Sequence, residues 1–266
     1  MNFQENQQKV IDNPDDWENH WRDYAYATMK NPAQSMRHHL LLDEINALGT
    51  RCNLLIDIGS GVGDFLKMSV QAHVANEYIG FEISEMGVDI SRHKVPEAIF
   101  YQVDLYSPPK EVIPYIAMAD VVVCSEVIEH VDDPIEFCRR IKAYVKPGGK
   151  LLLTVPGGPM SSFDKHIGHR THFNRASIDK LLTAAGFNVD KIHLSGFPFF
   201  NLYRLLVLFR GKRLITDIKS NQGIFSRVLS NLMMGCFRVL FFFNMRHSLY
   251  GWQVIVSASR PEGPVL

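Results

Sequence analysis

Short apolar runs alternate along this chain with segments whose apolar residues recur at helical spacing. Six runs have the length of strands, at 54–59, 78–83, 99–105, 120–127, 151–156 and 191–197. Helices are predicted before and between them, over 34–48, 65–72, 84–95, 134–146 and 174–186. Because strand–helix alternation at this spacing builds a parallel sheet, the pattern predicts an α/β fold.

The ends of the chain add to this alternation. Residues 17–26 hold two tryptophans and two tyrosines and predict a short helix that docks on the rest, and a last strand is predicted at 252–259. We therefore expect a doubly wound, mostly parallel seven-stranded sheet with helices on both faces, an N-terminal helical segment and a helical insertion before the last strand. The expected domains are a helical segment at 1–49, a core at 50–197 and 250–260, and an insertion at 198–249.

Charge and cysteine content narrow the class of protein. The formal net charge is zero, which gives no global field for a nucleic acid, and we expect no nucleic-acid partner. Four scattered cysteines without a C-x-x-C pair argue against a disulfide scaffold or a zinc site. The N-terminus lacks an apolar signal region, and no apolar run is long enough to span a bilayer, so we expect a cytoplasmic protein. The oligomeric state stays open.

A glycine-rich turn follows the first predicted strand. It reads Asp57-Ile58-Gly59-Ser60-Gly61-Val62-Gly63, and glycines there let the backbone approach a ligand closely. A dinucleotide site needs Gly or Ala where this turn has Asp64, whose carboxylate would repel a pyrophosphate. Asp57 instead suits a ligand with a cationic amino group.

Two further strand ends carry acids. Glu82 lies 19 residues after Gly63, where α/β folds that bind nucleotides place the acceptor for ribose hydroxyls. Asp104 and Leu105 end the third strand, where an acceptor and an apolar wall suit an adenine ring. An Asx turn that starts at Asp104 is the alternative.

Taken in order, D-I-G-S-G-V-G, F-E-I-S, V-D-L, S-E-V-I-E-H-V and V-K-P-G-G-K-L-L-L-T-V-P resemble the class I S-adenosylmethionine-dependent methyltransferase superfamily. The branch that the chain most resembles includes the ubiquinone-biosynthesis O-methyltransferases. The resemblance covers about residues 50–197 and the last strand. It implies S-adenosyl-L-methionine as the cofactor.

The resemblance also implies which residues bind the cofactor. Asp57, Gly59 and Gly61 would cradle its methionine part, while Glu82, followed by Ile83, would take the ribose. The remaining implied contacts are Asp104 and Leu105 beside adenine, Ser125, Glu126 and Val127 beside the sulfonium, and Arg37 at the methionine carboxylate.

Histidines supply the candidate catalytic bases. His130 follows the fourth strand, and FDKHIGHRTHF, after the fifth, contains His166, His169 and His172, of which His169 is the leading candidate. These histidines with Asp164 could also ligate a metal, but there is no helical HExxH pattern and a glycine breaks the loop. We expect no metal.

The insertion is the most individual segment. Residues 197–246 predict two apolar helices with eight Lys/Arg and one acid, Asp217. They suit a cap that forms a pocket for a hydrophobic acceptor, a peripheral contact of 198–246 with an anionic membrane, or both. Simple enlargement of the core is the third interpretation.

The expected function is transfer of a methyl group from S-adenosylmethionine to an O or N of a hydrophobic small molecule. Quinone-like, lipid-linked and secondary-metabolite acceptors all fit. The alternative is a non-catalytic S-adenosylmethionine-binding regulator or partner module, and a nicotinamide oxidoreductase is a distant third.

Overall fold

A computed structural model describes residues 16–28, 31–49, 52–219 and 224–263, without the side chains of 23–28, 210–219 and 224–231. Its centre is one seven-stranded sheet with the order β3-β2-β1-β4-β5-β7-β6. The strands are β1 (Cys52–Ile58), β2 (Ala75–Glu82), β3 (Ile99–Gln102), β4 (Ala119–Ser125), β5 (Val145–Pro156), β6 (Asn188–Ser195) and β7 (Gln253–Ser259). Only β7 runs antiparallel to its neighbours, β5 and β6. The predicted fold class is confirmed.

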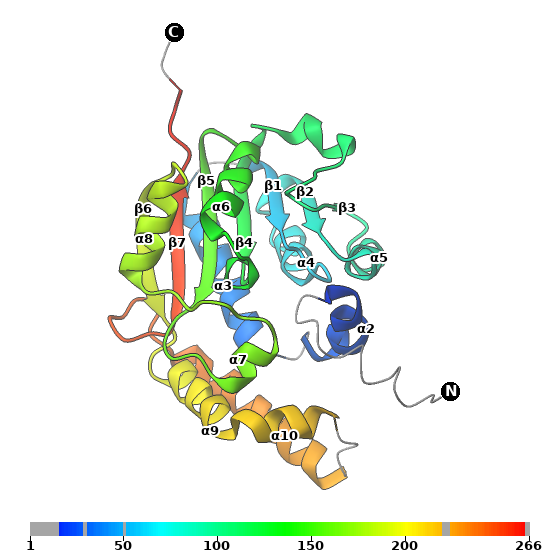
Figure 1. Cartoon of the computed structure of the whole chain (residues 1–266), viewed down its shortest axis with the longest axis vertical. Coiled ribbons are helices and arrows are strands. Elements are labelled where there is room, and N and C mark those ends of the chain that lie inside the picture. Colours follow the sequence, from blue (N-terminus) through cyan, green and yellow to red (C-terminus); the bar gives the residue numbers. More distant parts are fainter. Residues whose placement is uncertain (1–15, 29–30, 50–51, 220–223, 264–266) are drawn as a thin grey trace.

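Helices cover both faces of the sheet (Figure 1). Side chains of η1 (Lys110–Tyr115), α6 (Pro134–Tyr144) and α8 (Arg175–Ala184) pack in one apolar cluster, which includes Val112, Ile141 and Leu182. The opposite cluster contains Leu41, Leu66 and Val88 of α3 (Pro32–Ala47), α4 (Asp64–Gln71) and α5 (Glu85–Lys94). The central strands of the sheet are therefore buried on both faces, as their apolar sequences predict.

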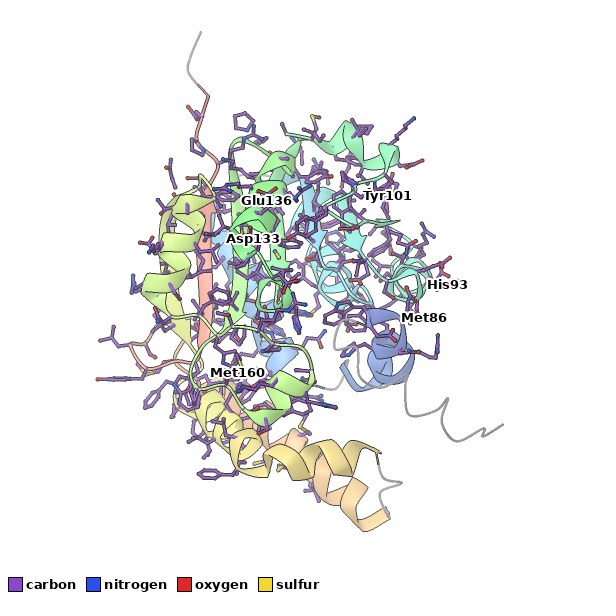
Figure 2. All side chains as sticks on the ribbon, in the orientation of Figure 1. Met86, His93, Tyr101, Asp133, Glu136 and Met160 are labelled. Atoms are coloured by element: carbon purple, nitrogen blue, oxygen red, sulfur yellow. The ribbon has the colours of Figure 1, made fainter. Side chains whose placement is uncertain are left out.

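Local capping explains where the helices begin. Asp133 accepts a hydrogen bond from the backbone N–H of Glu136 at the N-terminus of α6 (Figure 2). Asn31 caps α3 through the N–H of Ala33, with Pro32 in the first turn. These caps satisfy amide groups that a helix cannot satisfy internally. The start of α6 agrees with the prediction, whereas α3 begins at Pro32, two residues before the predicted position.

Two predicted boundaries are wrong. The third strand ends at Gln102 and not at residue 105, because Asp104 turns the chain by accepting the N–H of Tyr106. The helix predicted to reach residue 146 ends at Tyr144, and Pro147-Gly148-Gly149 lies inside β5. There the Gly148 N–H bonds to the Arg260 carbonyl, and the β4–β5 register shifts, so the segment extends the strand.

The N-terminal helix α2 (Trp17–Thr28) docks beside the sheet, as its aromatic residues predict. Glu18 accepts the backbone N–H groups of Glu85 and Met86 and so caps α5 from outside. The side chains of Tyr24 and Tyr26, part of that prediction, lie outside the described residues. Glu18 thus holds the first turns of α2 over the end of β2.

The insertion forms α9 (Phe199–Lys219) and α10 (Ile224–Leu240), followed by η3 (Phe241–Phe243). Near the core, Phe200, Phe237 and Phe241 pack with Ala33 of α3. Figure 1 shows the other end of the helix pair projecting away from the sheet. The insertion therefore has a base that joins the core and a tip that does not.

Candidate functional site

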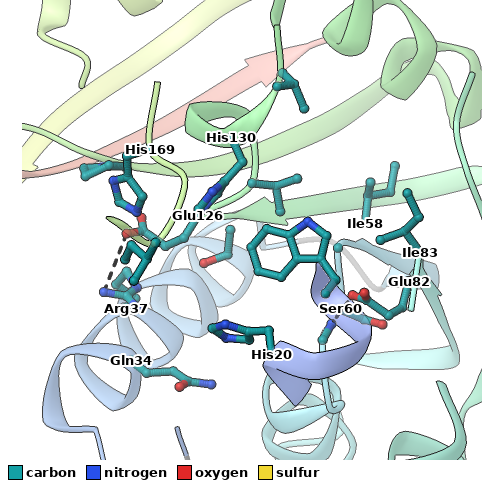
Figure 3. Close-up of a pocket in the computed structure, with 18 of the residues that line it drawn as sticks. His20, Gln34, Arg37, Ile58, Ser60, Glu82, Ile83, Glu126, His130 and His169 are labelled. Carbon is teal, nitrogen blue, oxygen red and sulfur yellow. Dashed lines mark hydrogen bonds and ion pairs between the residues drawn. The ribbon is translucent and has the colours of Figure 1, made fainter. Parts of the chain in front are cut away.

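A cavity of about 820 Å³ lies at the carboxyl ends of the parallel strands (Figure 3). In an open α/β sheet this edge is where ligands bind. All eleven residues predicted to bind the cofactor line this one cavity: Arg37, Asp57, Gly59, Gly61, Glu82, Ile83, Asp104, Leu105, Ser125, Glu126 and Val127. Their individual roles stay predictions.

The glycine turn forms the floor of the cavity. Gly59 and Gly61 have φ values of 73° and 56°, in the left-handed region that favours glycine. A Cβ on Gly61 would come within 2.8 Å of the Trp21 ring. The Gly61 N–H donates to Glu82 Oε2 at 2.8 Å, so the turn and the strand-end acid are joined.

Asp57 and Glu82 are buried acids that no arginine or lysine side chain pairs among the described residues. Burial, and then the charge of Glu82, raise the pKa of Asp57 to about 8. Burial also raises the pKa of Glu82, although the hydrogen bonds from the backbone of Ser84 and Gly61 act to lower it. The Ser60 hydroxyl nearby has no hydrogen-bond partner among the described residues. A ligand that carries a positive charge and a diol therefore fits this end of the cavity, as S-adenosylmethionine does.

The raised pKa predicts that cofactor affinity depends on pH. Below pH 8 Asp57 is protonated in the free protein, whereas a bound cation favours its charged form. S-Adenosylhomocysteine, which keeps the amino group, should therefore bind more tightly as the pH rises from 6 to 7.5, by up to about tenfold per unit. Calorimetry at several pH values would measure this. An equal pH dependence in Asp57→Asn would assign the effect to another group.

The structure adds to the sequence interpretation of three residues near the turn. Glu82 is 4% exposed and is not a solvated strand-end acid. Asp104 lines the cavity and also makes the Asx turn, so both interpretations of it hold. Asp64 pairs with Lys94 at 2.7 Å, which weakens the repulsion that the sequence predicts between Asp64 and a pyrophosphate.

Glu126 occupies the centre of the site in a strained conformation. Its φ is 56°, which costs a non-glycine residue of order 1–3 kcal/mol. Thr154 and Gln253 donate to its Oε1 at 3.1 and 2.9 Å, and Arg37 lies 3.7 Å from Oε2. Figure 3 shows Arg37 and His169 beside this carboxylate. Strands β4, β5 and β7 and helix α3 thus hold Glu126 toward the cavity.

The structure separates the four candidate bases. His130 and His169 line the cavity with ring centroids 4.7 Å apart. His172 lies behind His169, outside the cavity lining, and its Nε2 is 3.1 Å from His169 Nδ1. His166 is exposed on α7 (Ser162–His166), away from the lining, so we no longer expect it to act as a base.

Burial keeps the two candidate bases that line the cavity neutral. It lowers the pKa of His130 to about 3, with His169 adding to the effect. It lowers the pKa of His169 to about 4, although the charge of Asp164 opposes this. A neutral imidazole has a lone pair that accepts a proton, so both histidines are in the form that base catalysis requires at pH 7.

Two sets of side chains bring three metal-ligating atoms within 4.8 Å of one another: Glu129, His130 and His169, and Asp164, His169 and His172. Asp164 already accepts two hydrogen bonds from Arg204. Burial, and then Glu126, raise the pKa of Glu129 well above its usual range, which favours a neutral carboxyl. The expectation of no metal stays a prediction, and activity lost on chelation would contradict it.

Several residues that line the cavity had no predicted role at the cofactor site. Trp17 and Trp21 come from α2, and Trp21 Nε1 lies 3.4 Å from Glu82 Oε1, the acceptor predicted for ribose. Tyr203 and Arg204 come from α9, and Trp252 precedes β7. The aromatic content of 17–26 and 197–203 was the available signal, but only the packing of these helices shows which side chains face inward.

Comparisons with known proteins agree with this geometry. The family model of the methyltransferase domain matches residues 33–192. A probable S-adenosylmethionine-dependent methyltransferase of Mycolicibacterium smegmatis is 29% identical over 152 residues, 54% of this chain and 56% of that protein. A ubiquinone biosynthesis O-methyltransferase of Coxiella burnetii is 30% identical over 104 residues, 38% of this chain and 42% of that protein. The matches therefore span about half the length of these relatives.

A solved structure is similar in fold. Phosphoethanolamine N-methyltransferase 2 of Haemonchus contortus, in complex with S-adenosyl-L-methionine, aligns with a TM-score of 0.53 and 18% identity, over 80% of this chain and 50% of that one. The fold is that of the S-adenosylmethionine-dependent methyltransferases. The chain belongs to the methyltransferase domain family, whose model covers more than half of it.

Proposed function

We propose that the protein transfers a methyl group from S-adenosylmethionine to an oxygen or nitrogen of a hydrophobic small molecule. The observation that carries this proposal is one cavity with three kinds of wall. Buried Asp57 and Glu82 suit a cationic nucleoside at one end, His169 lies in the middle, and Phe200 and Tyr203 provide an apolar wall from α9. The O-methyltransferase relative of Coxiella burnetii supports a quinone-like acceptor.

The chemistry assigns distinct roles to the residues. The bound cofactor supplies a methyl group on a positively charged sulfur, which already favours transfer. Asp57 and the glycine turn would hold its methionine part, and Glu82 would accept its ribose hydroxyls. Glu126, fixed by Thr154 and Gln253, would orient groups beside the reacting atoms. His169 would take the proton of a hydroxyl acceptor.

Release of S-adenosylhomocysteine tests the proposal. A panel of apolar phenols, quinols and amines should contain a member that raises this release well above the rate without acceptor, and the product should carry one added methyl group by mass. Cofactor binding without turnover on any member would favour the alternative, a non-catalytic S-adenosylmethionine-binding regulator or partner module.

The wall from α9 should determine acceptor binding without affecting the cofactor. Val207 lines the cavity in the second turn of α9 after Phe200, far along the chain from the nucleotide motifs. In Val207→Asp an unpaired charge would face an apolar acceptor, at a cost of roughly 1–3 kcal/mol, so KM should rise about tenfold. Leu206→Asp, at a position that does not line the cavity, is the matched control. Equal effects in both variants would contradict the assignment.

The insertion is also proposed as a peripheral membrane contact. Phe209, Phe242 and Phe243 are 85%, 84% and 69% exposed. Segment 197–246 carries eight Lys/Arg against one acid, although the side chains of 210–231 lie outside the description. No helix that the structure describes is long and apolar enough to cross a bilayer. An exposed aromatic surface with an excess of basic residues suits the face of an anionic bilayer.

Vesicles test this contact. Those with anionic lipid should bind the protein more than neutral ones, and salt should reverse binding because it screens the charges. Phe242→Ser with Phe243→Ser should weaken binding, whereas Ile113→Ser, at an exposed apolar residue of η1, should not. Absence of binding to either vesicle would remove the membrane contact from the proposal.

A further inference from the structure

His172 is a buried histidine that the proposed chemistry does not use. Its side chain is 6% exposed and does not line the cavity. It nevertheless lies directly behind His169, with the two ring centroids 5.3 Å apart. The backbone N–H of His169 donates to the Asp164 carbonyl at 2.9 Å, which fixes the segment that carries both rings.

A chain of two hydrogen bonds runs from the backbone through both rings. His172 Nδ1 is 3.1 Å from the carbonyl oxygen of Gly158. A carbonyl oxygen can only accept, so Nδ1 of His172 carries the hydrogen. His172 Nε2 is 3.1 Å from His169 Nδ1. In a neutral His172, Nε2 is therefore an acceptor, and Nδ1 of His169 must donate to it.

The groups around His172 favour its neutral form. Burial lowers the pKa of His172, and this outweighs the Gly158 carbonyl and the carboxylate of Asp164. Asp164 Oδ2 lies 3.9 Å from His172 Nε2, beyond hydrogen-bond distance. Arg204 and the N–H of Ser161 already donate to that carboxylate. Arg204 also repels a positive charge on either ring.

We infer that His172 is a positioning residue that holds His169 in the tautomer with hydrogen on Nδ1, so that Nε2 of His169 is free to accept the proton of the acceptor. The inference rests on the proposed function, in which His169 is the base. The Gly158 carbonyl orients His172, His172 orients His169, and only His169 reaches the cavity. Neither histidine could make this arrangement alone, because each neutral ring has one donor and one acceptor.

Methyl transfer to a hydroxyl acceptor requires that the acceptor lose its proton. The acceptor O–H bond breaks, its hydrogen moves to Nε2 of His169, and the oxygen forms the bond to the methyl carbon as the carbon–sulfur bond breaks. S-Adenosylhomocysteine leaves neutral at sulfur, and the positive charge resides on His169 until the proton passes to solvent. The bond from Nδ1 of His169 to His172 strengthens at that moment, because a charged donor makes a stronger hydrogen bond.

Nuclear magnetic resonance can detect the tautomer directly. In protein with ¹⁵N-labelled histidine and bound S-adenosylhomocysteine at pH 7.5, His169 should show a protonated Nδ1 and an unprotonated Nε2. This measurement of the tautomer requires neither a methyl acceptor nor a variant protein. His169 with hydrogen on Nε2 in the unmodified protein would overturn the inference.

Variants of His172 test whether this residue determines the tautomer of His169. His172→Phe keeps a ring of similar volume but removes the acceptor, so His169 should become a mixture of tautomers. His172→Gln supplies an amide oxygen as acceptor and should restore the Nδ1–H form. His93→Phe, at an exposed histidine of α5, is the matched control and should change nothing. An unchanged tautomer in His172→Phe, verified as folded by thermal melting, would also overturn the inference.

Kinetics distinguish this inference from the proposed function. With an acceptor from the release assay, His172→Phe should lower kcat about tenfold or more, as wrong-tautomer variants of a base do, with unchanged affinity for S-adenosylhomocysteine. His172→Gln should recover most of that loss. Full turnover in His169→Ala together with the Nδ1–H tautomer would contradict the proposed base and leave the tautomer assignment standing.

Discussion

Glu82→Ala should weaken the binding of S-adenosylmethionine and S-adenosylhomocysteine about 10- to 150-fold, or about 1.5–3 kcal/mol. Hydrogen bonds to a charged acceptor have this magnitude, and the buried position of Glu82 excludes water that could replace it. Glu82 also accepts the N–H groups of Gly61 and Ser84, so its removal should loosen the turn that is proposed to hold the methionine part. Calorimetry with S-adenosylhomocysteine measures the change.

Two controls separate ribose binding from damage to the turn. Glu82→Gln keeps an acceptor for the ribose and for the backbone, so its loss of affinity should be smaller than that of Glu82→Ala. Glu77→Ala, at an exposed acid earlier in the same strand, should have no effect. A change of only a few tenths of a kcal/mol in Glu82→Ala would mean that this carboxylate does not bind the cofactor.

His169→Ala should lower kcat for a hydroxyl acceptor about a hundredfold, because a positioned base contributes typically 10²–10⁴-fold. The neutral ring lines the cavity beside Glu126, as Figure 3 shows, and its pKa of about 4 keeps it deprotonated across the physiological range. Affinity for S-adenosylhomocysteine should be unchanged, because the proposed cofactor ligands are the buried acids at the other end of the cavity.

The matched control is His93→Ala on α5, an exposed histidine outside the cavity lining (Figure 2). An acceptor that ionises without help would also make the histidine dispensable, so the acceptor chosen should have a hydroxyl that is protonated at the assay pH. Turnover within tenfold of the unmodified protein at saturating acceptor would remove His169 from the proposed mechanism, and His130 would be the next base to test.

Local sequence determined most of the fold. Apolar runs predict the strands, since a central strand that is buried on both faces is apolar almost throughout, and helical periodicity predicts the helices between them. Asp133 and Asn174 predict helix starts, since their side chains accept hydrogen bonds from amide groups three residues ahead. Spacing along the chain also predicted that Asp57, Gly61 and Glu82 lie together in one cavity, because they lie at or just after strand ends that a parallel sheet brings to one edge.

Only the tertiary structure shows which side chains from distant parts of the sequence contact one another. Trp21 reaches Glu82 because Glu18 pins α2 to α5. Arg204 binds Asp164 because α9 leaves the sheet beside the α7 segment. His166, His169 and His172 look alike in sequence, yet one is exposed, one lines the cavity and one lies behind it. A histidine's chemistry depends on the partner of each ring nitrogen, and the Gly158 carbonyl that sets this order is 14 residues from His172.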